Sequence, residues 1–147
     1  LRYYTDIRYI ADEKTLKAYK FLQDWPTKAK FLRHFWKNSD PTPGTVTNER
    51  LLEHMLRMNH TENRFVERRR KRGSDTDKGR VYIKYGPPDE IDYHTSAAGQ
   101  KPYEAWLYEQ KGDYQFIFRD RRGSGIYELV HSTYPGEVYN PYWRSDF

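Results

Sequence analysis

The sequence predicts an α+β fold in which N-terminal helices pack on one face of a C-terminal antiparallel β-meander. Apolar residues recur at helical spacing between residues 12 and 65, and apolar and polar residues alternate after residue 80. A run of helices followed by a run of strands is typical of this fold class. Because no repeat and no domain boundary interrupts the chain, we expect a single domain over residues 1–147.

The composition is highly charged but rich in aromatic residues. Charged residues make up 32% of the chain, which alone would suggest disorder, but aromatic residues make up 17% and can form a small core. The absence of cysteine excludes disulfides and a cysteine nucleophile, and no apolar run reaches the ~20 residues of a transmembrane helix. Since the chain begins with Leu1 and not Met, we expect a fragment of a longer or processed precursor.

Two helices are expected before residue 40. Asp12 can cap the first, and Pro26 suits the first turn of the second. Two prolines and a glycine within residues 38–45 then end the second helix in a stiff loop. The expected buried residues are Leu16, Tyr19 and Leu22 in the first helix, and Phe31, Leu32, Phe35 and Trp36 in the second.

A third helix is expected after this loop. Thr47 or Asn48 can cap it, and Glu49 lies in its first turn, where a negative charge is favourable. Its expected buried face consists of Leu51, Leu52, Met55, Leu56 and Phe65.

Four antiparallel strands are expected after the third helix. The first is RVYIKY at residues 80–85, in which every second residue is apolar. The other three lie within residues 102–109, 113–120 and 125–132, and turns that contain glycine separate them. Residues 86–101 are expected to form a loop.

Turn-forming residues surround the first expected strand. We expect a glycine to end the preceding helix, and Asp and Thr side chains to accept backbone N–H groups where the strand begins. A second glycine then permits an unusual φ, and two prolines prevent further ladder hydrogen bonds. These structural turn residues are Gly73, Thr76, Asp77, Gly86, Pro87 and Pro88.

An enzyme is the alternative interpretation of this segment. Asp75, Asp77 and Asp89 could form the site of a hydrolase or of a cation-dependent enzyme. Counting Asp75 as the first position of an EF-hand places Arg80 where glycine is required, which excludes that motif. The chain also lacks HExxH, GxSxG and a glycine-rich phosphate loop. We therefore assign no catalytic residue, no metal ligand and no cofactor.

A basic run, ERRRKR at residues 67–72, contributes to the net charge of +5. A nucleic-acid-binding module is therefore a third interpretation. No aromatic residue is interleaved with these charges to stack on bases, so we disfavour a nucleic acid partner. We expect instead the polar rim of a protein interface, formed by Arg68, Arg69, Arg70, Lys71 and Arg72.

Aromatic residues also lie outside the periodic elements, at both ends of the chain. Tyr and Trp are enriched at protein interfaces because they bury much area at little entropic cost. The C-terminal aromatic residues can alternatively fold back on their own domain, and the sequence leaves both interpretations open. The expected interface residues are Tyr3, Tyr4, Tyr139, Tyr142 and Trp143.

Three stretches of the sequence resemble the GWxTD domain family, and the resemblance covers roughly residues 7–147. Gly73, Thr76 and Asp77 match the motif that gives the family its name, and Ser74 stands where the family has Trp. The three stretches are DPTPGTVTNE at residues 40–49, GSDTDKGRVYIKYGPPDEI at residues 73–91 and YEAWLY at residues 103–108.

The resemblance implies a function and a compartment. Members of the family are bacterial, mainly envelope-associated proteins without established catalytic residues. The resemblance therefore implies a non-catalytic protein-interaction or scaffold domain, an accessory subunit of a cell-envelope or membrane-associated assembly. Its partners would be other protein subunits, membrane proteins among them, and the protein would be periplasmic or otherwise exported.

Overall fold

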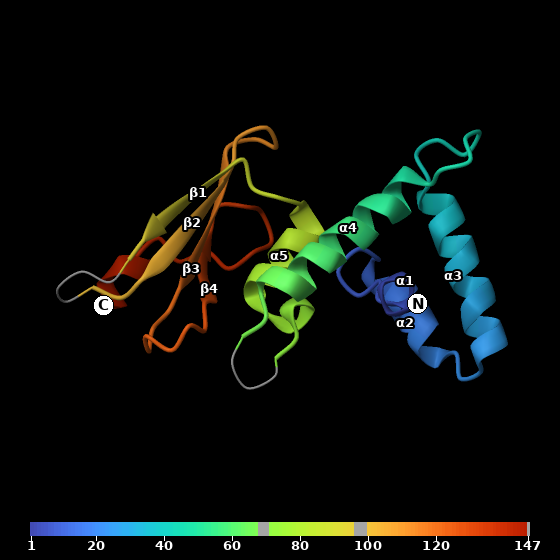
Figure 1. The fold of residues 1–147 in the computed structure, drawn as a ribbon, viewed down its shortest axis with the longest axis horizontal. Helices are drawn as coiled ribbons and strands as arrows, with labels where there is room; N and C mark the ends of the chain where they lie inside the picture. Colours follow the sequence, from blue (N-terminus) through green and yellow to red (C-terminus); the bar gives the residue numbers. More distant parts are fainter. Residues whose placement is uncertain (68–70, 96–99, 147) are drawn as a thin grey trace. The chain divides into compact units, whose positions relative to one another are not determined.

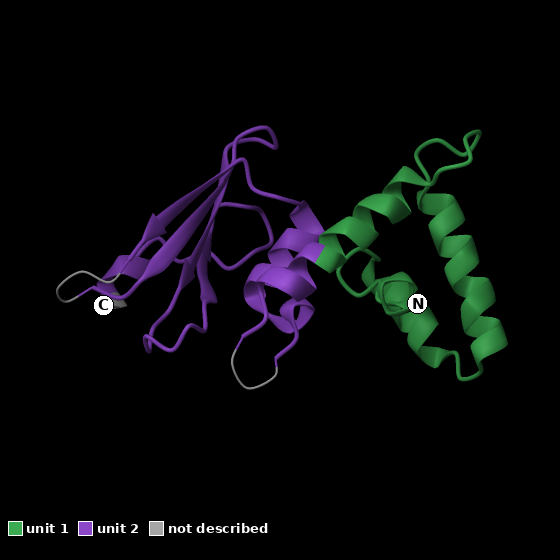
Figure 2. Cartoon of the chain, in the orientation of Figure 1, with its two compact units in different colours: residues 1–59 green, residues 60–147 purple. Residues whose placement is uncertain are grey.

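The computed structural model describes residues 1–67, 71–95 and 100–146. The chain forms two compact units, Leu1–Asn59 (unit 1) and His60–Phe147 (unit 2), as Figure 2 shows. Helices occupy the N-terminal half, and a four-stranded antiparallel sheet lies in the C-terminal half (Figure 1). The predicted α+β class is therefore confirmed. That the whole chain acts as one domain stays a prediction.

The three longer helices that begin in unit 1 start with a side-chain cap. Asp12 accepts a hydrogen bond from the Thr15 N–H at 2.7 Å, and Asp24 accepts one from the Thr27 N–H at 2.9 Å. Asn48, one of two predicted caps, accepts a backbone N–H at 3.0 Å in the same way. The helices are α1 (Arg2–Thr5), α2 (Glu13–Phe21), α3 (Trp25–Ser39) and α4 (Glu49–Arg64).

The buried face of α4 differs from the predicted one. Leu52 and Leu56 are exposed, whereas His54 and Met58 are buried. The His54 ring lies 5.1 Å from that of Trp36, and its Nε2 lies 2.9 Å from a backbone oxygen of α1. At 100° per residue, Leu52 and Leu56 lie about 140° and 180° around the helix from the midpoint between His54 and Met58. Leu51 and Phe65 pack against buried clusters as predicted, and a histidine with these partners can occupy a core position, so hydrophobicity alone identified only part of the buried face.

The sheet of unit 2 is a meander with the order β1–β2–β3–β4, and each neighbouring pair is antiparallel. Three strands fall within their predicted ranges, and Gly112, Gly123 and Gly125 in the connecting turns have positive φ. The elements of unit 2 after α4 are η1 (Gly73–Asp75), α5 (Asp77–Tyr85), β1 (Glu90–His94), β2 (Tyr103–Tyr108), β3 (Tyr114–Arg119), β4 (Glu128–Ser132) and η2 (Trp143–Asp146).

The prediction of a strand at residues 80–85 is wrong, because these residues belong to helix α5. The Thr76 hydroxyl caps the helix, Asp77 lies in its first turn, and Gly86 follows its last residue with a φ of 88°. These are the usual signals of helix ends. Short apolar runs fit a buried helix as well as a strand. The alternating residues that suggested a strand, all buried in the helix, are Val81, Ile83 and Tyr85.

The first strand is β1, which lies in the stretch that the sequence assigns to a loop. Because β1 pairs only with β2 among the named strands and is largely exposed, it lacks the alternation that identifies a half-buried strand. The expectation that Gly73 ends a helix is also wrong. Helix α4 ends at Arg64, and Gly73 begins the 3₁₀ turn η1.

The core of unit 2 consists of two buried clusters, one on each face of the sheet. Strands alternate their side chains between two faces, and here one set contacts the helix while the other contacts the C-terminal segment. The first set is Trp106, Tyr108, Phe116 and Phe118, which pack with Val81 and Tyr85 of α5. The second set is Ala105, Ile117 and Val130, which pack with Trp143.

Candidate protein-interaction surface

The segment from Gly73 to Gly79 is a corner in which the backbone lies unusually close to itself. A Cβ on Gly73 would lie 1.9 Å from the Thr61 carbonyl oxygen, and a Cβ on Gly79 would lie 1.8 Å from the Gly73 carbonyl oxygen. The Thr76 hydroxyl donates to the Gly73 carbonyl oxygen at 2.7 Å and accepts from the Gly79 N–H at 3.0 Å. Ser74 is fully buried, and its N–H donates to a carboxylate of α4 at 2.7 Å. These contacts hold the start of α5 against the end of α4.

The structure gives two of the three candidate catalytic carboxylates separate partners. Asp77 accepts the Leu129 N–H at 2.7 Å, which joins α5 to β4, and Asp89 accepts the Gln110 N–H at 3.0 Å. Asp77 begins α5 and Asp89 follows its end, and nine helical residues span about 13 Å. Asp75 lies in η1 beside Asp77. The structure does not bring Asp89 together with the other two.

Three histidines of the described chain contact aromatic rings or backbone groups. The His60 ring stacks on Tyr82 at 4.3 Å, and burial lowers the pKa of His54, His60 and His131. Among residues 1–67, 71–95 and 100–146, no three His, Asp or Glu side chains gather in a way that could hold a metal ion.

Other predicted turn residues follow α5. The Gly86 carbonyl accepts the Tyr108 hydroxyl at 2.7 Å, which fixes the end of the helix on β2. Pro87 and Pro88 lie between α5 and β1.

Glu137 joins the C-terminal segment to α5. The Arg80 guanidinium donates to both Glu137 carboxylate oxygens, at 2.9 and 2.7 Å, and the Tyr85 hydroxyl donates to one of them. Burial alone would raise the pKa of Glu137, but the hydrogen bonds from Arg80 and Tyr85 outweigh burial and lower that pKa. Burial and the hydrogen bond to Glu137 raise the pKa of the Tyr85 hydroxyl. The carboxylate is therefore held charged between its two donors.

The C-terminal tail, residues 133–146, contacts both sides of the sheet: Tyr134 packs against Tyr85 of α5, and Trp143 packs on the face opposite α5. Trp143 is only 5% exposed and packs against three apolar residues of that face. Burial lowers the pKa of His131 and so favours the neutral ring. The Nδ1 atom of the neutral ring can accept the hydrogen bond that the Asn140 N–H donates. The hydrogen bonds that hold the tail backbone include Ser132 N–H to Val138 O at 2.7 Å, Asn140 N–H to His131 Nδ1 at 3.0 Å, and Arg119 Nη1 to Trp143 O at 3.1 Å.

Two tyrosines of this tail point into solvent. Tyr139 is 71% exposed and Tyr142 is 76% exposed. The residues on either side of Tyr142, Pro141 and Trp143, line a groove on the same face of the sheet. We call Tyr139, Tyr142 and this groove the tail surface. The groove is lined mainly by Asp92, His94, Tyr103, Gln115, His131 and Trp143.

The structure places the predicted interface residues in different environments. Tyr4 packs on the core of unit 1, and Tyr3 is half-buried. Trp143 belongs to the core of unit 2, whereas Tyr139 and Tyr142 are exposed. The tail therefore divides between the two alternatives that the sequence leaves open. Whether its tyrosines contact a partner stays a prediction.

The predicted polar rim lies mostly outside the described residues. Arg68, Arg69 and Arg70 lie outside the described residues. Lys71 is exposed, and Arg72 lies 3.6 Å from the Glu62 carboxylate. These two residues alone do not test the proposed rim. Both the rim and the nucleic-acid interpretation therefore stay predictions.

The sequence did not reveal the residues that hold the tail in place. Glu137 is a single acid in an aromatic segment, and its partner Arg80 was assigned to a strand. His131 and Arg119 lie on strands and bond to residues close to the C-terminus. The one usable signal is the aromatic content of the tail, which is too high for a solvated chain end.

These features define an α+β domain with a glycine-packed corner and a tail that bonds to α5 through Glu137 and packs on the opposite sheet face through Trp143. The chain matches the model of the GWxTD domain over residues 2–145, and it therefore belongs to the GWxTD domain family. No curated protein and no solved structure gives a significant match to the chain. Among the helices that the structure describes, none is long and apolar enough to cross a membrane.

Proposed function

We propose that this chain is a protein-interaction domain, an accessory subunit of a bacterial cell-envelope assembly, and that it binds its partner through the tail surface. One observation carries the proposal: Tyr139 and Tyr142 are largely exposed on a backbone that is fixed on both sides of them. A mobile chain end can expose aromatic residues by accident. A tail that is ordered by a buried tryptophan and a half-buried ion pair is better explained by presentation of its tyrosines.

The physical advantage of this arrangement is preorganisation. Binding costs conformational entropy for each side chain and backbone segment that becomes ordered. Trp143 and Glu137 already order the tail in the free protein, so a partner would have to immobilise only the tyrosine side chains. Tyrosine has few rotatable bonds and a large apolar ring, which makes it a frequent anchor residue at interfaces.

The envelope location is supported by family membership. The chain belongs to the GWxTD family, and the resemblance to that family implies an envelope-associated protein whose partner would be another subunit or a membrane protein. Fractionation of the native bacterium tests this part of the proposal separately. Recovery of the protein only from the cytosol would contradict it.

A photo-crosslinking residue at the tail surface tests the proposed interface. We expect benzoylphenylalanine in place of Tyr142, in the native cell, to give one discrete protein adduct that excess wild-type chain suppresses. Val46 is fully exposed in unit 1 and provides a matched control position. Adducts of equal yield at positions 142 and 46, or adducts with nucleic acid alone, would contradict the proposal.

Alanine substitutions then separate binding from folding. We expect Tyr139→Ala with Tyr142→Ala to weaken the complex by more than about 2 kcal/mol, because anchor tyrosines commonly contribute that much, and to leave Tm unchanged. Trp143→Ala should lower Tm, because it empties part of the core. If the tyrosine variant binds as well as the wild type, the tail surface is not the interface.

A further inference from the structure

The helices α2 and α3, with their flanking residues 12–40, form a hairpin in unit 1 that is rich in positive charge. It contains seven Lys and Arg residues and four acidic residues. Three of the acids are occupied by backbone N–H groups: Asp12 and Asp24 cap the two helices, and Asp40 accepts an N–H of the following loop at 2.9 Å. The acidic residues of the hairpin therefore do little to neutralise its cations.

Most of these cations form no ion pair within the described part of the chain. Lys17 is paired with Glu13 at 2.9 Å, and Lys28 lies over the Tyr19 ring. The other five form no ion pair with any residue that the structure describes. All five are exposed: Lys14, Lys20, Lys30, Arg33 and Lys37.

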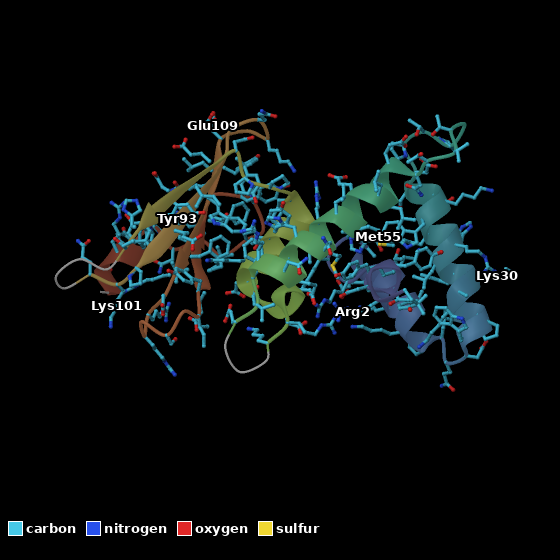
Figure 3. All side chains as sticks on the ribbon, viewed as in Figure 1. Arg2, Lys30, Met55, Tyr93, Lys101 and Glu109 are labelled. Carbon is cyan, nitrogen blue, oxygen red and sulfur yellow. The ribbon has the colours of Figure 1, made fainter. Side chains whose placement is uncertain are left out.

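Three of these cations share one face of α3. Lys30, Arg33 and Lys37 are spaced three and four residues apart, which places them in one row along a helix. The Lys30 side chain extends outward from α3 in Figure 3. The row borders a groove whose apolar residues are Leu22 and Phe31. Positive charge and apolar surface therefore lie side by side along this helix.

Two aromatic residues are exposed at the turn that joins α2 to α3. Phe21, the last residue of α2, is 82% exposed, and Trp25, the first residue of α3, is 48% exposed. The other three tryptophans of the chain are buried. Only three residues separate Phe21 from Trp25, so the turn carries both rings at its tip.

We propose that this hairpin docks on a bilayer that contains anionic phospholipids. Phe21 and Trp25 would enter the interface between headgroups and acyl chains, and the unpaired cations would contact lipid phosphates. Tryptophan is favoured at that depth of a bilayer, and clustered Lys and Arg residues near an aromatic anchor are typical of proteins that bind anionic membranes. This surface belongs to unit 1, so the inference is independent of the tail surface proposed above.

A bilayer fits this surface better than a protein or a nucleic acid does. Two rings on a tight turn offer little of the roughly 800 Å² that each partner contributes to a standard protein interface. Single-stranded nucleic acids stack their bases on aromatic residues along a basic groove, whereas Phe21 and Trp25 do not line the groove beside the cation row. A flat anionic surface requires only a small insertion and several distributed cations.

Flotation of the 147-residue chain with vesicles tests the proposal. We expect the protein to float with phosphatidylglycerol vesicles in dilute buffer and to remain unbound with phosphatidylcholine vesicles. Arg33→Gln with Lys37→Gln should weaken binding about thirtyfold, because each cation near an anionic surface contributes roughly a factor of five. Lys101→Gln with Arg122→Gln, which removes two exposed cations from unit 2, should leave binding unchanged.

Tryptophan fluorescence reports the insertion directly, because Trp25 is the one tryptophan with substantial exposure. We expect vesicles with brominated acyl chains to quench the emission of the wild type and to have little effect on Trp25→Phe. The proposal is overturned if the chain does not bind phosphatidylglycerol vesicles, if both cation pairs have the same effect, or if Trp25 is not quenched. Binding of single-stranded DNA or of an acidic protein without vesicle binding would assign the surface to that ligand instead.

Discussion

Single atoms decide the geometry at the corner between α4 and α5. Only glycine fits at positions 73 and 79, because a Cβ at either position would lie within 2 Å of a carbonyl oxygen. Neither glycine has a positive φ, so backbone freedom is not the reason for them. In this chain the first residue of the GWxTD motif is therefore a packing residue.

Gly73→Ala should be strongly destabilising, by about 3 kcal/mol or more, because the backbone of Thr61 cannot move aside without disturbing α4. Chemical denaturation measures the loss of unfolding free energy. Gly44→Ala provides the matched control, because a Cβ there meets nothing within 4 Å and its φ is not positive. Equal stability of the two variants would contradict the close packing of this corner.

Glu137 should make the protein sensitive to acid. Its pKa is lowered in the folded state, so it stabilises the fold above its ordinary pKa of 4.5, and that stability is lost as pH falls through the folded value. We expect Glu137→Gln to cost about 2 to 4 kcal/mol at pH 7, because Arg80 and Tyr85 lose a charged acceptor.

The control for this prediction is Glu109→Gln, which changes an exposed glutamate of unit 2. Unfolding in urea at pH 7 and at pH 3 should show a smaller loss of stability on acidification for Glu137→Gln than for the wild type. An unchanged dependence on pH would mean that the Arg80–Glu137 pair contributes nothing measurable.

At the scale of elements, the sequence predicts well where local signals and burial agree. Asp12 and Asn48 identify two helix starts, and the alternation in β2 to β4 identifies three strands. The sequence failed at α5 and β1 because their patterns are ambiguous. A nine-residue helix with alternating buried residues resembles a strand, and an exposed edge strand resembles a loop. In α5 the decisive signals were the cap at Thr76 and the glycine after Tyr85.

The site was harder to predict than the fold. Aromatic content indicated that the tail matters, but not which of its rings is buried. Which rings are buried depends on hydrogen bonds made by Glu137, His131 and Arg119. These bonds join residues that meet only in the folded chain. No local pattern encodes such contacts, so Trp143 and Tyr142 could not be distinguished by sequence alone.

The helical state of α5 can be tested at Lys84, which is exposed in the last turn. In a helix Lys84→Ala should be more stable than Lys84→Val by about 0.5 kcal/mol, because β-branched side chains lose rotamer freedom there. In a strand the order would be reversed. Thermal unfolding of the two variants therefore gives a difference whose sign reports the secondary structure.

At the scale of the whole molecule, the family match spans both compact units, and each unit carries its own candidate surface. Unit 1 carries the cationic hairpin and its exposed aromatic pair. Unit 2 carries the tail surface, which depends on an ordered C-terminal segment. Because the two proposed surfaces belong to different units, each can be removed by substitution without touching the other.

The central claim is that the tail is a fixed part of unit 2 that presents Tyr139 and Tyr142. Hydrogen exchange of the Asn140 amide tests it most directly, because that N–H donates to His131 and lies between the two tyrosines. At pH 7 we expect this amide to exchange on the order of 100-fold more slowly than in an unfolded peptide. The protection should disappear in Trp143→Ala while the amides of β2 and β3 stay protected. Exchange of Asn140 at the unfolded rate in the wild type would show a mobile tail and would contradict the claim.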